Sequence, residues 1–387
     1  MRELLEDISA GRGTQQTIAL LEELAVAVKD TTMCGLGQSA SNPVLSTLRY
    51  FRQEYERHIV DKRCDAMVCK ELVGAPCQAA CPIGTEAWRY VAHIARDDYE
   101  SAYLAIRETN PFPSVCARVC DHGCEASCRL GSTGPAPVAI RALKRFVTDR
   151  IPPSTYEPER ADLNGKRIAV VGSGPAGMTA AHKLSLLGYE VTVVEADNKP
   201  GGMLVSGVPT YRLPRDVLQR EIDALLDDRI TVRCGTALGR DVTIDELLAD
   251  HAAVFLALGA HRSRRLYVEG EDCAGVYPSM RFLKAWNLKG ENLAKGKVGI
   301  IGGGNSAVDA ARVARRHADV ESVTIYYRRS RQEMPAFEEE IKAALKEGVR
   351  LEALVTPTKI RGETGHLTHL ELISNDLGEI DESQRRR

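Results

Sequence analysis

Two segments of the chain share the same order of apolar strand, glycine-rich turn, helix and second strand. In the first, RIAVVGSG ends in glycine, AGMTAAHKLSLLG follows as a helix, and YEVTVVEA is a second apolar run. In the second, KVGIIGGGNSAVDAARVARRH leads to SVTIYYRR. Strands and helices that alternate in this way build βαβ units with parallel strands. The sequence therefore predicts an α/β fold with two Rossmann-like, doubly wound domains.

The first glycine turn has the pattern of a dinucleotide-binding loop. Its first glycine permits a tight turn, the second lets the backbone approach a pyrophosphate, and the third allows close packing of helix on strand. An acid at the end of the second strand can accept hydrogen bonds from the hydroxyls of an adenosine ribose. The predicted site consists of Gly172, Gly174, Pro175, Ala176, Gly177 and Glu195.

The second glycine turn is followed by arginines in place of an acid. Guanidinium groups at that position suit the 2'-phosphate of NADP(H) better than the free hydroxyl of NAD(H), and a solvated basic edge is the alternative interpretation. The predicted residues are Gly302, Gly303, Gly304, Asn305, Ser306 and Ala307 in the turn, and Arg328, Arg329 and Arg331 after the strand. Two unequal sites of this kind suggest a flavin in the first and a nicotinamide in the second.

The cysteines gather in one region before these motifs. Nine of the 11 lie between Cys34 and Cys128, and CARVCDHGCEASC repeats cysteine at every fourth position. The start of the chain is acidic and lacks the apolar run of a signal peptide, so a reducing, cytoplasmic compartment is expected, where such a cluster indicates metal rather than disulfides. The net charge of -2 gives no reason to expect a nucleic acid, and the apolar runs are too short to span a bilayer.

Thiolates at these spacings, followed by proline, are typical of iron–sulfur sites. Zinc is the alternative for the whole set, and it is most plausible where His58, Cys64 and Cys69 could form three corners of a tetrahedron. The helical stripe Val44, Leu48, Phe51 and Tyr55 precedes this region and is expected to pack inward.

A stretch rich in proline and charge, residues 147–166, has no apolar period and is predicted to be a linker. The expected domains are residues 1–60, a helical iron–sulfur region; 61–150, a second helical iron–sulfur region; 165–290, a flavin-binding domain; and 291–387, a nicotinamide-binding domain.

The ordered motifs APCQAACP, NPFPSVCARVC, GSGPAGMTAA, PGGML, GVPTYRLP, FLALGA, GGGNSAVDAAR and YYRRSRQEMPA resemble one known family. It contains the glutamate synthase small subunit, the N-terminal half of dihydropyrimidine dehydrogenase and the large subunit of bifurcating NADH-dependent ferredoxin NADP oxidoreductase. The resemblance implies that NAD(P)H passes hydride to FAD and that two [4Fe-4S] clusters exchange electrons with it. It carries the cluster ligands onto Cys77, Cys81, Cys120, Cys124 and Cys128.

Other ligands depart from the family pattern. Cys64 and Cys69 stand at a different spacing, and the position where relatives use Glu or Gln is Lys144, so Cys116 is a candidate replacement, or one cluster is absent. The N-terminal motifs GRGTQQTIALLEEL and MCGLGQSASNPVLSTLRYF are similar to the end of the complex I flavin subunit, in which Cys34 would bind a [4Fe-4S] cluster. Both resemblances imply a chain that begins and ends inside a domain.

The leading hypothesis is an electron-transfer flavoprotein in which the cofactors carry the chemistry, so no catalytic side chain is expected. The expected flavin surroundings are Gly202, Met203, Leu204, Arg212 and Gly259. The expected partners are other subunits of an electron-transfer complex, of glutamate synthase large-subunit, ferredoxin or hydrogenase type. A metal-bearing scaffold is the alternative, and a disulfide reductase is disfavoured because Cys234 and Cys273 have no cysteine close by in sequence.

Overall fold

The chain folds into two units, Met1–Tyr156 and Glu157–Arg387, in a computed structural model that describes residues 1–64, 66, 68–72, 74–363 and 366–379. The boundary between the units falls inside the stretch predicted to be a linker. That stretch begins later than predicted, because Val147 and Thr148 still belong to a helix. The finer division into four domains remains a prediction.

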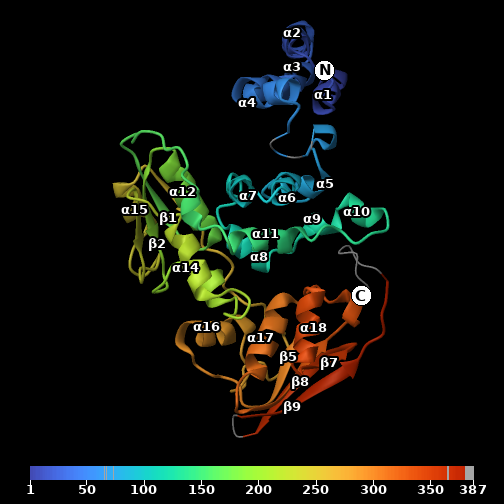
Figure 1. Ribbon diagram of the computed structural model, residues 1–387, viewed down its shortest axis with the longest axis vertical. Coiled ribbons are helices and arrows are strands. Elements are labelled where there is room, and N and C mark those ends of the chain that lie inside the picture. Colours follow the sequence, from blue (N-terminus) through green and yellow to red (C-terminus); the bar gives the residue numbers. More distant parts are fainter. Residues whose placement is uncertain (65, 67, 73, 364–365, 380–387) are drawn as a thin grey trace. The chain divides into compact units, whose positions relative to one another are not determined.

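The described residues of the first unit contain helices and no strand (Figure 1). The α-helices are α1 (Arg2–Ser9), α2 (Gln15–Thr31), α3 (Gly35–Ala40), α4 (Asn42–Val60), α5 (Pro76–Ala79), α6 (Ala87–Ile94), α7 (Tyr99–Arg107), α8 (Pro113–Val119), α9 (Gly123–Ala126), α10 (Arg129–Ser132) and α11 (Ile140–Thr148). Two short 3-10 turns are η1 (Lys70–Leu72) and η2 (Pro153–Thr155).

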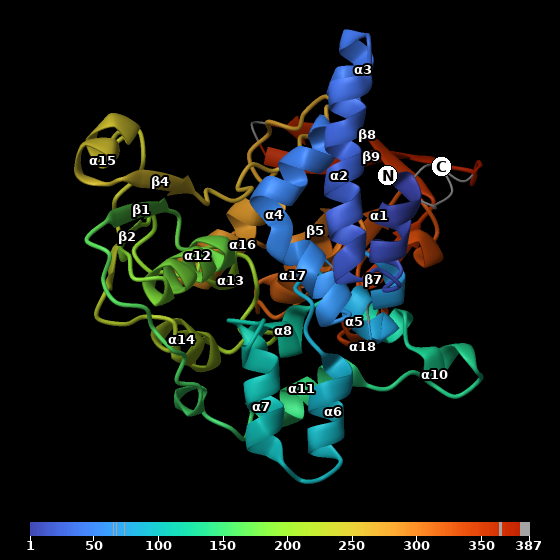
Figure 2. The ribbon, with the colours of Figure 1, turned by 90° about the horizontal axis from the view of Figure 1, so that it is seen from above.

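Helices α1, α2 and α4 pack side by side around one apolar cluster, as Figure 2 shows. The cluster contains Ile18 and Leu48 at helical spacing, which bury one face of each helix. Phe51 does not join it and is exposed, so its predicted place in the stripe was wrong. The reason is a kink: the backbone of Phe51 leaves the helical region and turns the side chain away.

Helices α6, α7 and α11 enclose a second cluster, which contains the fully buried Tyr90 and Tyr103. The hydroxyl of Tyr90 donates a hydrogen bond to the carbonyl of Ile140, the first residue of α11. The thiols of Cys77 and Cys124 pack against the same cluster. Apolar side chains therefore lie directly against two of the predicted cluster ligands.

The second unit begins with a parallel sheet of order β3-β2-β1-β4. Its elements are β1 (Arg167–Val171), α12 (Pro175–Leu186), β2 (Glu190–Val194), α13 (Met203–Ser206), α14 (Arg215–Asp223), β3 (Ile230–Arg233), α15 (Ile244–Asp250), β4 (Ala253–Leu256) and α16 (Ser279–Lys289). Strand β1 is central and its apolar residues are buried, as expected of a strand paired on both sides.

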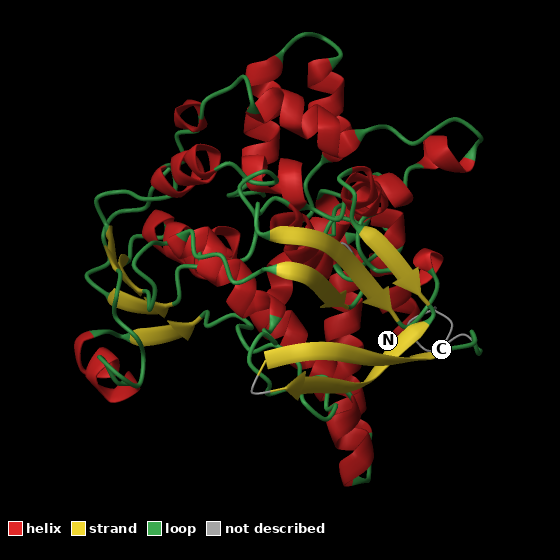
Figure 3. Cartoon of the chain, turned by 90° about the horizontal axis from the view of Figure 1, so that it is seen from below, coloured by secondary structure: helices red, strands yellow, loops and turns green. Residues whose placement is uncertain are grey.

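A second parallel sheet, of order β5-β6-β7, follows, and an antiparallel pair β8-β9 completes the unit (Figure 3). The elements are β5 (Gly296–Ile301), α17 (Asn305–Arg315), β6 (Val320–Tyr327), η3 (Arg331–Glu333), α18 (Glu338–Lys346), β7 (Arg350–Ala353), β8 (Val355–Glu363) and β9 (His366–Ser374). Helix α17 is buried along most of its length between β6 and its neighbours α16 and α18.

In the part of the chain that the structure describes, no helix combines the length and the apolar composition needed to cross a membrane.

Candidate functional site

The first glycine turn joins β1 to α12 in a conformation that its sequence dictates. Gly172 has φ +104°, and a β-carbon there would stand 2.3 Å from the carbonyl oxygen of Ala257. A β-carbon on Gly177 would stand 1.8 Å from the carbonyl oxygen of Gly172. The turn therefore closes only with glycine at both positions, and Pro175 and Ala176 begin the helix whose N-terminal amides face the turn.

Glu195 lies at the carboxyl end of β2 with its carboxylate beside this turn. The carboxylate accepts hydrogen bonds from the backbone N–H of Ser173 (2.9 Å) and from the Ser173 hydroxyl (2.5 Å). It also accepts one from the backbone N–H of Asp197 (2.7 Å). Since a carboxylate has about four acceptor positions, one remains, and a ribose hydroxyl could also take the place of the Ser173 hydroxyl. The negative charge of Glu195 is buried, and these three hydrogen bonds compensate for its lost hydration, as an adenosine-binding acid requires.

The segment after β2 returns to the glycine turn. The backbone N–H of Gly201 donates to the Ser173 carbonyl (3.0 Å), and Gly202 approaches Gly174 so closely that a β-carbon would stand 2.8 Å from its α-carbon. Met203 and Leu204 then begin α13. Three of the predicted flavin neighbours thus lie next to the first glycine turn, while Gly259 (φ +68°) follows β4 in an exposed loop.

The second glycine turn joins β5 to α17. Gly302 has φ +122°, and a β-carbon there would stand 3.7 Å from the β-carbon of Ala307, an ordinary contact. Ala307 occupies the place of the third glycine in this turn. Asn305 and Ser306 begin α17, and the Asn305 side-chain oxygen accepts from the backbone N–H of Phe337, which precedes α18.

The three arginines after β6 differ in their surroundings. Arg328 is exposed, Arg329 is buried, and Arg331 is exposed but paired with Glu338 of α18 (2.7 Å). Arg328 is thus exposed at the predicted position after β6, whereas Arg329 is buried and Arg331 is paired with Glu338. Of the three, it is the best placed to meet a phosphate.

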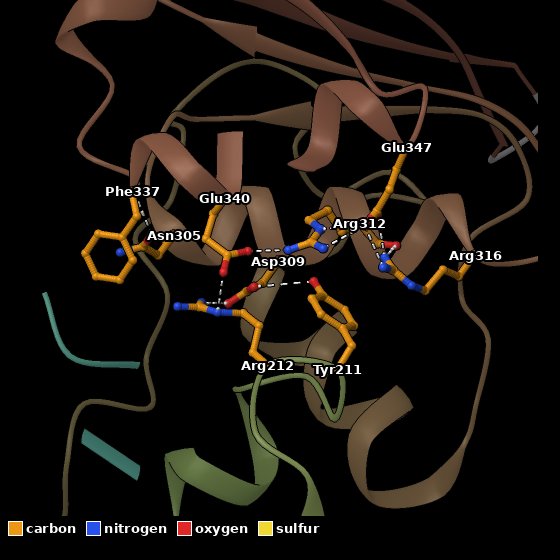
Figure 4. A network of polar contacts seen from close by, with 9 residues as sticks. All are labelled: Tyr211, Arg212, Asn305, Asp309, Arg312, Arg316, Phe337, Glu340 and Glu347. Carbon is orange, nitrogen blue, oxygen red and sulfur yellow. Dashed lines mark hydrogen bonds and ion pairs between the residues drawn. The ribbon is translucent and has the colours of Figure 1, made fainter. Parts of the chain in front are cut away.

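Arg212 occupies a buried set of charges rather than an open surface (Figure 4). Its guanidinium donates to Asp309 of α17 (2.8 Å) and pairs with Glu340 of α18 (3.2 Å). Glu340 also pairs with Arg312, which pairs in turn with Glu347. Arg212 thus has carboxylate partners on two helices, and its predicted place beside the flavin stays a prediction.

Burial changes the pKa of two residues in this network, Asp309 and Tyr211. Burial raises the pKa of Asp309 to about 6, against the lowering effect of the Arg212 guanidinium. The ring of Tyr211 contacts two guanidinium groups, those of Arg312 (4.4 Å from the ring centroid) and Arg316 (4.1 Å). Burial, together with the Asp309 charge, raises the pKa of its hydroxyl. Sequence reasoning missed these residues because each partner is distant in the chain.

The cysteines separate into groups in the first unit. Burial raises the pKa of Cys124 to about 11, and Cys120 and Cys81 add to the rise because their charges are close. Burial also raises the pKa of Cys77, with a smaller contribution from Cys128. These charge interactions group Cys81 and Cys120 with Cys124, and Cys128 with Cys77.

A lysine faces the first of these groups. Lys144 on α11 is 8% exposed, and its charge lowers the pKa of both Cys120 and Cys124 against the larger effect of burial. The backbone N–H of Arg141, one turn earlier, donates to Glu125 of α9 (2.8 Å) and fixes α11 beside the cysteines. The position at which the resemblance implies a Glu or Gln ligand therefore lies close to Cys120 and Cys124, and here it carries an amine.

The remaining predicted ligands have contacts of their own. The Cys34 thiol is exposed and caps α3 by accepting from the backbone N–H of Gly37 (3.4 Å). The Cys116 thiol donates to the side-chain oxygen of Asn110 (3.7 Å). His58, Cys64 and Cys69 form a separate group whose ligand atoms all lie within 4.8 Å of one another.

Two dinucleotide-type glycine turns in one unit, with clustered thiols in a helical unit before them, define a class: flavin- and iron–sulfur-dependent pyridine-nucleotide oxidoreductases. Comparison with known families gives the same class. Residues 1–58 match the NADH-ubiquinone oxidoreductase-F iron-sulfur binding region, residues 48–155 match dihydropyrimidine dehydrogenase domain II with its 4Fe-4S cluster, and residues 166–383 match the pyridine nucleotide-disulphide oxidoreductases.

Curated relatives extend over nearly the whole chain. The NADP(+)-dependent formate dehydrogenase subunit beta of Moorella thermoacetica is 36% identical, with 99% of this chain and 63% of that protein covered. The NADPH-Fe(3+) oxidoreductase subunit beta of Geobacter sulfurreducens is 37% identical, with 100% and 59% covered. The glutamate synthase [NADPH] small chain of Escherichia coli is 33% identical, with 80% and 69% covered.

The chain belongs to the pyridine nucleotide-disulphide oxidoreductase family and, within it, to the group of the glutamate synthase small chain. It spans 63% and 59% of the length of the first two relatives. The expected resemblance, fold class, oxidoreductase class and cofactor classes are confirmed. The individual site residues remain predictions.

Proposed function

We propose that this chain carries electrons between NADPH, FAD and [4Fe-4S] clusters as one part of a multisubunit oxidoreductase. The observation that carries the proposal is the pairing of two glycine turns of unequal chemistry in one unit: the first has a buried acid, Glu195, and the second is followed by an exposed arginine, Arg328. When bound, a flavin accepts a hydride and releases electrons singly, and iron–sulfur clusters take them one at a time.

The residues of the first turn fit FAD. Glu195 would hold the adenosine ribose, and the backbone from Gly172 to Gly177 would approach the pyrophosphate at the start of α12. The segment from Gly202 to Leu204, which contacts the turn at Gly174, would lie beside the flavin. These groups bind and orient, and no side chain needs to move a proton for hydride transfer.

The residues of the second turn fit NADPH. The start of α17 at Asn305 would receive the pyrophosphate, and Arg328 would meet the 2'-phosphate through a charge-assisted hydrogen bond. The formate dehydrogenase relative is named for NADP(+), and the Fe(3+) oxidoreductase relative is named for NADPH.

The cysteines of the helical unit fit iron–sulfur clusters. Cys81, Cys120 and Cys124 would supply three ligands of one cluster next to Tyr90, whose pKa is raised by burial and by the charges of Cys124 and Cys81. Burial raises the pKa of Cys120 and of Cys124, and a bound cation would displace the protons of these thiols and compensate the buried negative charge. Cys77 and Cys128 would contribute to another cluster.

The partners are proposed to be other subunits, because the relatives are named as beta subunits and small chains. Free thiols in such number suit a cytoplasmic, reducing compartment.

The test uses the full chain, purified without oxygen and supplied with FAD, iron and sulfide. NADPH is then added, and the loss of the flavin absorption band and the appearance of reduced-cluster signals in electron paramagnetic resonance are recorded. Bleaching by NADPH followed by cluster reduction is expected. A chain that takes up iron but binds no FAD, or binds FAD that NADPH does not bleach, would contradict the proposal.

A further inference from the structure

His58, Cys64 and Cys69 form a compact group in the first unit, next to the end of α4. The Nε2 atom of His58 lies 3.4 Å from the sulfur of Cys69, and the ligand atoms of all three residues lie within 4.8 Å of one another. Among the described residues this is the only set of three such side chains that meets this spacing. Cys64 is 4% exposed, and the other two are half-buried.

The imidazole of His58 is held in the form that a metal needs. Its Nδ1 atom lies 2.7 Å from the backbone carbonyl of Glu54, one turn earlier on α4. A carbonyl only accepts, so Nδ1 carries the hydrogen, and in the neutral ring Nε2 keeps its lone pair and faces Cys69. Histidines that bind metals commonly donate their other N–H to such a carbonyl, which fixes both the ring and its tautomer.

The spacing indicates a single ion. For a tetrahedral zinc with bonds of about 2.0 Å to nitrogen and 2.3 Å to sulfur, the nitrogen and sulfur ligands stand about 3.5 Å apart. The distance of 3.4 Å between His58 Nε2 and Cys69 Sγ agrees with that edge. Cysteines of a [4Fe-4S] cluster bind four different irons, so their sulfurs stand further apart than the ligands of one ion.

We propose that His58, Cys64 and Cys69 bind one zinc ion, separate from the iron–sulfur clusters. One histidine and two thiolates are ligands that zinc prefers, and two thiolates neutralise its charge, which suits the buried Cys64. Binding releases one proton from each thiol and leaves the oxidation states of sulfur and zinc unchanged. Burial and the neighbouring Cys64 raise the pKa of Cys69.

The ion would fasten the cysteine-bearing segment to the N-terminal helices. The same segment is already attached at two other points: Lys62 donates to the carbonyl of Gly11 (2.6 Å), and the side chain of Leu72 is buried beside that glycine. Ser9 on α1 lines the surface next to both His58 and Cys69, and its hydroxyl lowers the pKa of Cys69. A fourth position, for water, would lie on this side.

The test is metal analysis of the full chain, purified without oxygen, with zinc and iron measured in the same sample. We expect one zinc per chain in the unchanged protein and in the control Cys234→Ser, an exposed thiol of the second unit. His58→Gln and Cys69→Ser should lose zinc or bind it at least about tenfold more weakly. His58→Cys should keep it, since a third thiolate replaces the imidazole.

Cobalt(II) added to metal-free chain is the second measurement. A tetrahedral site with two thiolates should give intense sulfur-to-cobalt absorption in the unchanged protein and in His58→Cys, and should lose it in His58→Gln. Loss of iron and sulfide with unchanged zinc in Cys69→Ser would overturn the proposal, and so would wild-type zinc in both His58→Gln and Cys69→Ser. Flavin bleaching by NADPH does not depend on this ion, so the two proposals fail separately.

Discussion

Replacing Arg212 with methionine tests the buried charge network between the loop before α14 and helices α17 and α18. Methionine keeps much of the side-chain volume and removes the charge. The side chains of Arg212 and Asp309 are only 6% and 7% exposed, so solvent cannot take the place of the lost partner. Breaking one side of a buried pair typically costs about 3–5 kcal/mol.

The protonation of Asp309 limits this cost. With a pKa of about 6, Asp309 can take up a proton in the variant instead of remaining as an unpaired charge. At pH 8 the proton costs about 1.36 kcal/mol for each of two pH units. Adding about 1 kcal/mol for the lost hydrogen bond gives a loss of about 3–4 kcal/mol at pH 8. Near pH 5.5 the proton is already bound, and only about 1 kcal/mol should be lost.

The assay is urea unfolding of the second unit, monitored by tryptophan fluorescence. The chain has 2 tryptophans, Trp88 in the first unit and Trp286 in the second, so a Trp88→Phe background isolates the signal of Trp286. Trp286 packs against the apolar cluster that contains α17, its ring 4.4 Å from that of His317. The control is Lys284→Met, because Lys284 pairs with Asp197 but is 45% exposed and should contribute under about 1 kcal/mol.

The reasoning is refuted if Arg212→Met loses no more stability at pH 8 than Lys284→Met, or if its loss is the same at pH 5.5. A double-mutant cycle with Asp309→Asn gives a second check. We expect a coupling free energy of about 2 kcal/mol at pH 8, since the two residues are in direct contact. Additive losses would mean that Arg212 acts through packing alone.

Four further outcomes are expected. As the pH rises from about 4 to about 6, the contribution of Asp309 to the free energy of unfolding should fall, because its folded pKa of about 6 lies above the unfolded value of about 3.9. Urea titrations across this range should show the fall in the unchanged protein and not in Asp309→Asn. Gly177→Val should abolish FAD binding, measured by flavin absorbance, because even its β-carbon would overlap the Gly172 carbonyl. Arg328→Gln should raise the KM for NADPH at least about tenfold and leave that for NADH nearly unchanged, since the lost charge-assisted hydrogen bond contributes about 1.5–3 kcal/mol. Cys124→Ser should remove the iron and sulfide of one cluster while NADPH still bleaches the flavin, as metal analysis and absorbance would show.

The glycine turns could be predicted from sequence because their physics is local. Gly172 and Gly177 lie in one turn, and the strand before it and the helix after it are apolar in characteristic ways. The spacing of six residues therefore contains the steric reason for each glycine. The same holds for His58, Cys64 and Cys69, which follow one another closely enough for the spacing to predict their grouping.

Arg212 and Arg329 show where local reasoning ends. Arg212 stands in a loop rich in proline, and its partners Asp309 and Glu340 are brought to it by packing between distant helices. Arg329 follows a strand like its neighbour Arg328, yet the backbone of Leu354 pairs with its carbonyl and its side chain is buried. Exposure at the end of a strand depends on what the later chain places over it, which no local pattern contains.

The segment between the two glycine turns links them physically. Gly201 is hydrogen-bonded to Ser173 in the first turn, and the Arg215 guanidinium donates to the carbonyls of Leu204, Val205 and Val208. Between these anchors and α14, Arg212 pairs with Asp309 on the helix that starts at the second turn. Because each step is a directional contact that is at least partly buried, displacement of this loop would affect both turns. A buried charge in this loop can thus hold the two glycine turns in register, and buried polar contacts are retained where position matters more than stability.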